Sequence, residues 1–188
     1  MKNRIHYNSP VILTFSFLAF GVLLLGMLTQ GISTKLFFTS FRTSFYDPLQ
    51  YLRLFTYILG HANWAHFSSN FIIILLVGPM VEEKYGSKEL FKMIIFTAFL
   101  TGFINITFSN NALLGASGIV FMLILLSSFA NVKHGEIPLT LILVVIVFMG
   151  KEIFSGLFIQ DNIAHSAHII GGLCGGVFGY LKNRKKLE

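Results

Sequence analysis

Long apolar stretches separated by short polar segments dominate this sequence. Six of them approach or reach the roughly 20 residues that a helix needs to cross the hydrocarbon core of a bilayer. The six runs are Val11–Leu28, Trp64–Val81, Phe91–Phe108, Ala112–Ala130, Ile137–Leu157 and Asn162–Leu181. Lys151 and Glu152 interrupt the fifth run. The pattern predicts an all-α membrane protein, a bundle of six transmembrane helices forming one domain over residues 1–188.

Basic residues are divided unequally between the two sides of this layout. Four of the 14 fall on one side and ten on the other, the four being Lys35, Arg42, Arg53 and Lys151. Cytoplasmic loops carry the excess of Lys and Arg, so we expect both termini in the cytoplasm. The minimal six-span plan favours a bacterial plasma membrane. Because no A-x-A cleavage site follows the first run, we expect a retained helix rather than a signal peptide.

The composition excludes several classes of protein. Hydrophobic residues make up 54% of the chain and charged residues only 12%, against about 25% in soluble domains. These values exclude a soluble enzyme, a disordered chain and a nucleic-acid-binding protein. The net charge of +6 is explained by the loop asymmetry and by anionic lipid headgroups. A single cysteine, Cys174, excludes an internal disulfide and a multi-cysteine metal site, and we expect neither metal nor cofactor.

Polar residues inside apolar runs are costly and therefore suggest function. In the second run His66 and Asn70 are four residues apart and share one helix face. Ser117 lies in the fourth run between Gly115 and Gly118. Taken singly, each has a structural explanation, since Asn and His link membrane helices and small residues allow close packing.

The sixth run carries a histidine above a stripe of glycines. His168, Gly171, Gly175 and Gly179 are spaced by three, four and four residues, which places them on one helix face. Such a stripe allows close approach of a second helix. If that helix is the fourth, His168 reaches Ser117 and can act as its base. No Asp or Glu is expected in the outer half of any span, so the predicted arrangement is a Ser–His dyad.

The combination of these motifs closely resembles the rhomboid family of intramembrane serine proteases, over about Arg53 to Tyr180. The family's G-x-S-G motif is matched by Gly115, Ser117 and Gly118. Its H-x-x-G-x-x-x-G motif is matched by His168, Gly171 and Gly175, and its H-x-x-x-N pair by His66 and Asn70. One departure is Leu52-Arg53, where many members have Trp-Arg.

The resemblance implies a role for each matched residue. Ser117 would be the nucleophile and His168 the general base and then the general acid. The oxyanion would be bound by His66, Asn70 and the Ser117 amide. Phe121 would stack on the His168 ring, at a position where many relatives have Tyr.

Three further positions have expected structural roles. The acid that follows the family's second span is matched by Glu82, for which we expect a structural role in a loop. His61 and His165 match positions at the outer surface, and we expect them to cap helices. Asp161 or Asn162 would cap the start of the sixth span.

The implied partners are membrane lipids and substrate proteins, whose transmembrane helices would be cut near the outer face of the membrane. The sequence predicts no nucleic-acid partner and does not define an oligomeric state. Two other functions remain open, a catalytically silent rhomboid-like scaffold and a small polar-lined transporter. A transporter would usually show an internal repeat, which this sequence lacks.

Overall fold

The computed structural model describes residues 5–129, 132, 137–158 and 164–184. Within these residues the fold is all-α, as predicted, and contains no β-strand. The helices of the first half are α1 (Pro10–Leu28), α2 (Ile32–Phe37), α3 (Pro48–Thr56), the 3₁₀ turn η1 (Tyr57–Leu59) and α4 (Trp64–Tyr85). Those of the second half are α5 (Ser87–Phe108), α6 (Ser117–Ser128), α7 (Leu139–Val144), the π-helical turn η2 (Val145–Met149), α8 (Gly150–Phe158) and α9 (His165–Arg184).

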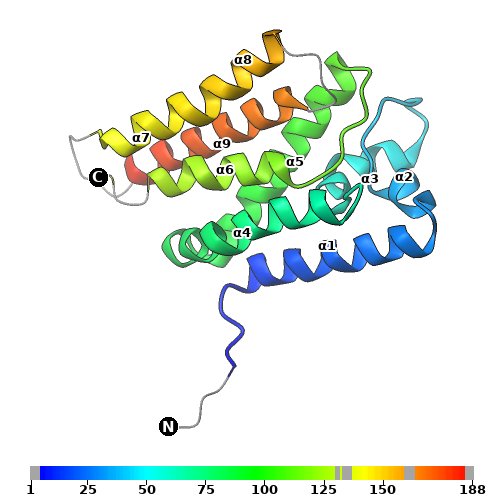
Figure 1. The fold of residues 1–188 in the computed structure, drawn as a ribbon, viewed down its shortest axis with the longest axis horizontal. Coiled ribbons are helices and arrows are strands. Elements are labelled where there is room, and N and C mark those ends of the chain that lie inside the picture. The colour runs from blue at the N-terminus through cyan, green and yellow to red at the C-terminus, as the bar shows by residue number, and fades with distance from the viewer. Residues whose placement is uncertain (1–4, 130–131, 133–136, 159–163, 185–188) are drawn as a thin grey trace.

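The long helices lie roughly side by side in the order α1, α4, α6, α9 and α7–α8 (Figure 1). Helix α5 crosses behind them and contacts α4, α6 and α9. The short helices α2 and α3 cover the right-hand end of the bundle in this view. Helix α9 ends at the opposite, left-hand end, and α1 begins near the middle of this view, below α4.

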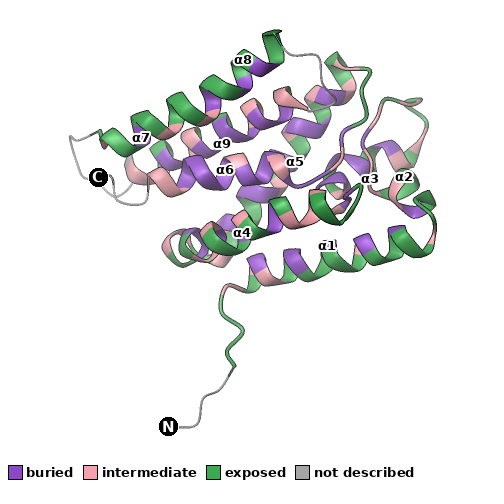
Figure 2. Cartoon of the chain, viewed as in Figure 1, coloured by how far each residue is buried: buried purple, intermediate pink, exposed green. Residues whose placement is uncertain are grey.

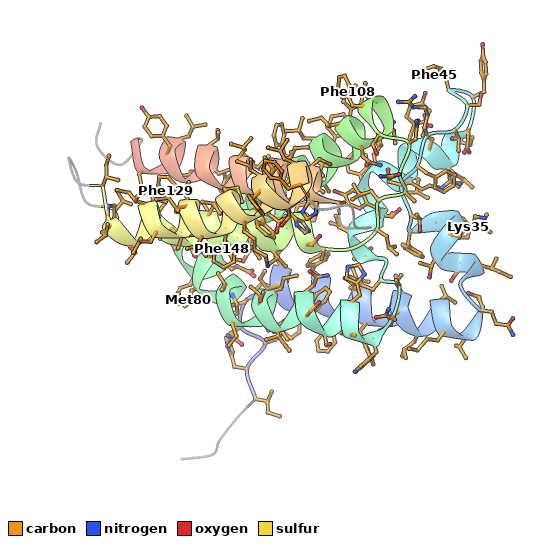
Figure 3. All side chains as sticks on the ribbon, turned by 45° about the horizontal axis from the view of Figure 1, so that its top comes forward. Lys35, Phe45, Met80, Phe108, Phe129 and Phe148 are labelled. Atoms are coloured by element: carbon orange, nitrogen blue, oxygen red, sulfur yellow. The ribbon has the colours of Figure 1, made fainter. Side chains whose placement is uncertain are left out.

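Helix α6 is the centre of the core. Eight of its residues are buried, including Ile119, Met122, Leu123 and Leu126, and Figure 2 shows it mainly in the colour of burial. The outer helices instead expose apolar side chains, such as Met80 and Phe108, which project from the bundle in Figure 3. An apolar exterior around a packed interior is what a lipid environment requires.

The expected count of six membrane spans is not confirmed. Four of the described helices are long and apolar enough to cross a membrane: α1, α4, α5 and the continuous helix Leu139–Phe158 formed by α7, η2 and α8. Helix α6 has 12 residues, so it is only about 18 Å long, against roughly 30 Å for a bilayer core. Helix α9 has 20 residues, but its histidines and glycines lower its mean hydropathy.

The fourth predicted span was placed too early. The helix begins at Ser117 rather than at Ala112, because the preceding residues are held in other conformations. Leu113 exchanges two backbone hydrogen bonds with Ser40, and Gly115 has φ +114°. The predicted end at Ala130 and the expected cap at Asp161 or Asn162 lie outside the described residues.

Glu82 lies within α4 rather than in a loop after it, and its structural role is specific. Its two carboxylate oxygens accept hydrogen bonds from the backbone N–H groups of Val11 and Ile12, each at 3.0 Å. Those donors belong to the first turn of α1, where N–H groups lack partners within the helix. The side chain of the N-cap residue Ser9 makes no capping hydrogen bond. Glu82 therefore caps α1 from a neighbouring helix and ties the two together.

Arg53 organises the segment between α1 and α4. It is buried, donates to the carbonyl of Leu36 at 2.7 Å and to the carboxylate of Asp47 at 3.2 Å, and lies over the ring of Phe41. A hydrogen bond from Thr43, followed by weaker contributions that include Arg53, lowers the pKa of Asp47. Arg53 thus packs this segment, whereas the side chain of Leu52, its neighbour in the chain, is exposed.

Candidate active site

Ser117 is the first residue of α6, and the turn before it is fixed by hydrogen bonds to two other segments. The N–H of Gly115 donates to the carbonyl of Tyr57 at 3.0 Å, and the N–H of Ala116 donates to Nε2 of His61 at 3.4 Å. At the N-terminus of a helix the backbone N–H groups have no intrahelical acceptor and favour negative charge. Ser117 is therefore held where its own amide can face an anion.

His61 supports this turn and is not a surface residue, so the expectation of an exposed helix cap is wrong. It is 2% exposed, and its ring packs against the rings of His66, Phe67 and Phe71. Nδ1 lies 3.2 Å from the carbonyl of Leu59, which leaves Nε2 to accept from Ala116. Burial and then the charge of His66 lower its pKa to about 4. His61 is therefore neutral near pH 7, as an acceptor at Nε2 must be.

His66 and Asn70 of α4 approach the same turn. A Cβ atom built on Gly115 would lie 2.6 Å from Nε2 of His66 and 3.8 Å from Nδ2 of Asn70. Any side chain there would fill the space between these donors and the start of α6, and φ of +114° is unfavourable for L-residues in any case. The amide of Asn70 donates to the carbonyl of His66 at 3.0 Å, so one of its two hydrogens is used. The structure thus brings His66, Asn70, Gly115 and Ser117 into one cluster.

His168 lies on α9, directly beside the first turns of α6. Its ring stacks on that of Phe121, with centroids 4.5 Å apart and planes inclined by 8°. Phe121 is four residues after Ser117, so both occupy one face of α6. Phe148, labelled in Figure 3, packs edge-on against Phe121 from η2, at 6.0 Å between centroids. The stacking expected between Phe121 and His168 is present, and it holds the imidazole on the serine-bearing face.

Glycines allow α6 and α9 to approach this closely. The two helices make the most extensive contact of any pair in the described structure. A Cβ atom on Gly171 would lie 2.8 Å from the carbonyl carbon of Gly118, and one on Gly175 would lie 3.0 Å from that of Met122. A Cβ atom on Gly118 would in turn lie 3.2 Å from the carbonyl oxygen of Ala167. The predicted stripe on the sixth span therefore faces the serine-bearing helix.

The prediction that no acid lies near the serine and histidine is wrong. Glu152 of α8 is 6% exposed, and its Oε2 accepts hydrogen bonds from Nδ1 of His168 at 2.8 Å and from Nδ1 of His165 at 2.7 Å. His165, expected only to cap a helix, thus binds the same carboxylate. The signal was present in the sequence, because a charged residue within an apolar run requires a partner at the same depth.

These three residues also form a group that could hold a metal ion. One donor atom each from Glu152, His165 and His168 lies within 4.8 Å of the others. Two imidazoles and a carboxylate are a ligand set found in zinc sites. The hydrogen bonds from both Nδ1 atoms already satisfy the carboxylate oxygen, however, and metal binding would have to displace both protons. The sequence predicted no metal, and this cluster is the place where that prediction can be tested.

Comparison with known proteins identifies relatives of this chain. A family model described as the Rhomboid domain matches residues 48–185. Rhomboid protease GluP of Bacillus subtilis is 30% identical over 182 residues, which cover 91% of this chain and 34% of that protein. Rhomboid-like protein 11, chloroplastic, of Arabidopsis thaliana is 28% identical over 121 residues, covering 63% of this chain and 40% of that protein. Rhomboid protease GlpG of Serratia proteamaculans is 26% identical over 145 residues, covering 74% and 52%.

The chain belongs to the rhomboid family. It spans between about a third and half of the length of these relatives. Together with its four long apolar helices, family membership identifies an integral membrane protein.

Proposed function

We propose that this protein is an intramembrane serine endopeptidase that cleaves transmembrane segments of other membrane proteins, with Ser117 and His168 as its catalytic residues. The observation that carries the proposal is the stacking of His168 on Phe121, one turn from Ser117 on the same face of α6. The names of the relatives, two of which are called rhomboid proteases, support the same activity.

In this mechanism Ser117 Oγ attacks the carbonyl carbon of the scissile bond while its proton passes to Nε2 of His168. The bond between carbon and nitrogen then breaks, and the same proton passes from His168 to the leaving amine. Water hydrolyses the acyl-enzyme in a second round with His168 again as base. Without His168 the serine would stay a neutral and weak nucleophile.

The tetrahedral intermediate would be stabilised by donors that already surround the start of α6. The backbone N–H of Ser117 lies at a helix N-terminus, and His66 and the second amide hydrogen of Asn70 approach from α4. Gly115 keeps this space clear of a side chain, whereas Gly118 allows α9 to approach α6. Preorganised donors of this kind typically contribute the largest share of the rate enhancement in acyl transfer.

The depth of the site favours a membrane-embedded substrate. Helix α6 is only about 18 Å long, too short to cross a hydrocarbon core of roughly 30 Å, which supports a position of Ser117 below the membrane surface. A helical substrate must expose its backbone to be cut, since its amides are otherwise bonded within the helix. Helix-breaking residues near the cleavage point should therefore favour cleavage. The proposed setting is a bacterial plasma membrane, with both termini cytoplasmic and lipids surrounding the bundle.

The proposal is tested in liposomes that contain the purified protein and one of a panel of single-span substrates. We expect cleavage near one end of at least one substrate segment, and no cleavage by Ser117→Ala. The matched control is Ser127→Ala at the other end of the same helix, whose hydroxyl bonds to the carbonyl of Ile124 and which should retain activity. Undiminished cleavage by Ser117→Ala would refute the proposal. Solute uptake by that variant would indicate a transporter, and a folded wild type that binds but never cleaves substrates would indicate a scaffold.

A further inference from the structure

The carboxylate of Glu152 lies at a position where burying a charge costs free energy. It lies on the helix Leu139–Phe158, one of the four apolar enough to span a membrane, and it is buried. Charged side chains at such positions are rare and pair with other polar groups. In the described part of the chain, the groups that hydrogen-bond to this carboxylate are two imidazole Nδ1 atoms, one of which belongs to His168.

The hydrogen bond constrains the chemistry of His168. An ionised carboxylate can only accept, so Nδ1 of His168 must carry the proton in this contact. In the neutral imidazole, Nε2 then has the free lone pair, as a base acting on a serine hydroxyl requires. The opposite tautomer would present an N–H to the serine and could not remove its proton. The stack on Phe121 fixes the plane of the ring, and the bond to Glu152 fixes its rotation within that plane.

We propose that Glu152 is a positioning residue for the proteolytic reaction, which makes the site a Ser117–His168–Glu152 triad rather than a dyad; this inference rests on the proposed function. When Ser117 Oγ forms its bond to the carbonyl carbon, the serine proton moves to Nε2 and His168 becomes an imidazolium. Glu152 stays ionised, keeps its hydrogen bond from Nδ1 and stabilises that positive charge. The proton on Nε2 then leaves with the amine product, and Glu152 exchanges no proton.

His165 completes the arrangement from the first turn of α9. Its Nδ1 donates to the same Oε2 atom, which gives the carboxylate a second anchor beside His168. Among the described residues, the other titratable or charged groups that act on His168 are Lys151, next to Glu152 on α8, and His66 from α4. Within this set of described groups Glu152 carries the negative charge, so its removal should have an effect on the protonation of His168 that the other changes do not reproduce.

The experiment measures kcat and KM against pH in liposomes for the wild type, Glu152→Gln, Glu152→Asp and the control His165→Asn. Replacing the carboxylate of a full serine protease triad by its amide lowers kcat by about 10⁴-fold. For Glu152→Gln we expect a loss of kcat of about 10²–10⁴-fold with KM changed less than about threefold, because Glu152 does not contact the substrate. The acid limb of the pH profile should move to lower pH, since the imidazolium loses its counter-charge. Glu152→Asp should recover part of kcat, and His165→Asn should scale the profile without moving it.

A second measurement on the wild type holds even if the variants fold poorly. Nitrogen-15 NMR of histidine-labelled protein reports which ring nitrogen of His168 is protonated, and we expect Nδ1. The inference would be overturned if the proton of neutral His168 were found on Nε2. It would also be overturned if Glu152→Gln kept the kcat and the pH profile of the wild type. If Ser117→Ala is inactive in that same case, the proposed protease function stands and only the role of Glu152 fails. If Ser117→Ala retains activity, the proposed function itself fails.

Discussion

Replacing Gly171 by Ala tests whether the contact between α6 and α9 sets the geometry of the site. The added methyl carbon would lie 2.8 Å from the carbonyl carbon of Gly118 and 3.0 Å from its Cα, and closer still to its carbonyl oxygen. All three atoms belong to the backbone, which cannot turn aside as a flexible side chain can. Carbon atoms prefer separations of roughly 3.5–4.0 Å, so α9 must move away from α6 by about 1 Å.

The expected effects follow from this displacement. Overpacking a well-filled interior typically costs about 1–3 kcal/mol of stability. Against this, Ala in a helix is favoured over Gly by about 1 kcal/mol. Because His168 lies one turn before Gly171 on the same helix, a shift of about 1 Å also misplaces the imidazole, which can lower the rate by roughly 10²-fold.

The matched control is Gly176→Ala on the same helix. A Cβ atom at Gly176 meets nothing within 4 Å in the described part of the chain, so this variant gains the helix propensity without the clash. Thermal unfolding in detergent and cleavage in liposomes are measured for both variants. We expect Gly171→Ala to be less stable than Gly176→Ala by about 1–3 kcal/mol and far less active. Equal stability and equal activity of the two variants would refute the packing described for α6 and α9.

Three other predictions follow from the structure. Asn70→Ala should lower kcat by up to about 10²–10³-fold, because His66 and the Ser117 amide remain as donors. This loss should be smaller than the loss caused by His168→Ala. Equal losses of kcat in the two folded variants would assign Asn70 to orienting the catalytic pair. Incubation with a chelator such as EDTA should leave cleavage unchanged, whereas a loss that added zinc restores would contradict the expectation of no metal, and the Glu152 cluster would then be the candidate site among the described residues. Glu82→Gln should reduce the free energy of unfolding by about 1–3 kcal/mol, because an amide cannot accept from both N–H groups of α1. The control is Glu83→Gln, a change at the exposed neighbouring residue, which should have little effect. Similar losses of stability in both variants would contradict the capping role.

The sequence was informative wherever spacing alone decides which residues share a face. The three- and four-residue intervals from His168 through Gly175 predict a single stripe, and the structure places that stripe against α6. The stacking of Phe121 on His168 was also expected, from the resemblance to the family. Helical periodicity is local, so it can be read without knowing the rest of the fold.

The features that were missed depend on contacts between segments far apart in the chain. Glu152 was seen as an interruption of an apolar run, because the sequence does not show that His165 and His168 lie across from it. His61 seemed to be a surface residue, since its burial depends on the turn before α6 that it supports. The start of α6 was misplaced because Leu113 is apolar and Gly115 is small, so the apolar run extends through them. Their backbone is nevertheless not helical.

The most direct test of the central claim is covalent labelling of the serine. The protein in liposomes is treated with a fluorophosphonate, digested and examined by mass spectrometry. We predict a phosphonyl adduct on Ser117 in the wild type and in Ser127→Ala, and a rate of labelling reduced by orders of magnitude in His168→Ala, where Ser117 is present but has no base. The account would be contradicted if Ser117 were labelled in His168→Ala at the same rate as in the wild type. It would also be contradicted if protein that cleaves substrate carried no adduct on Ser117.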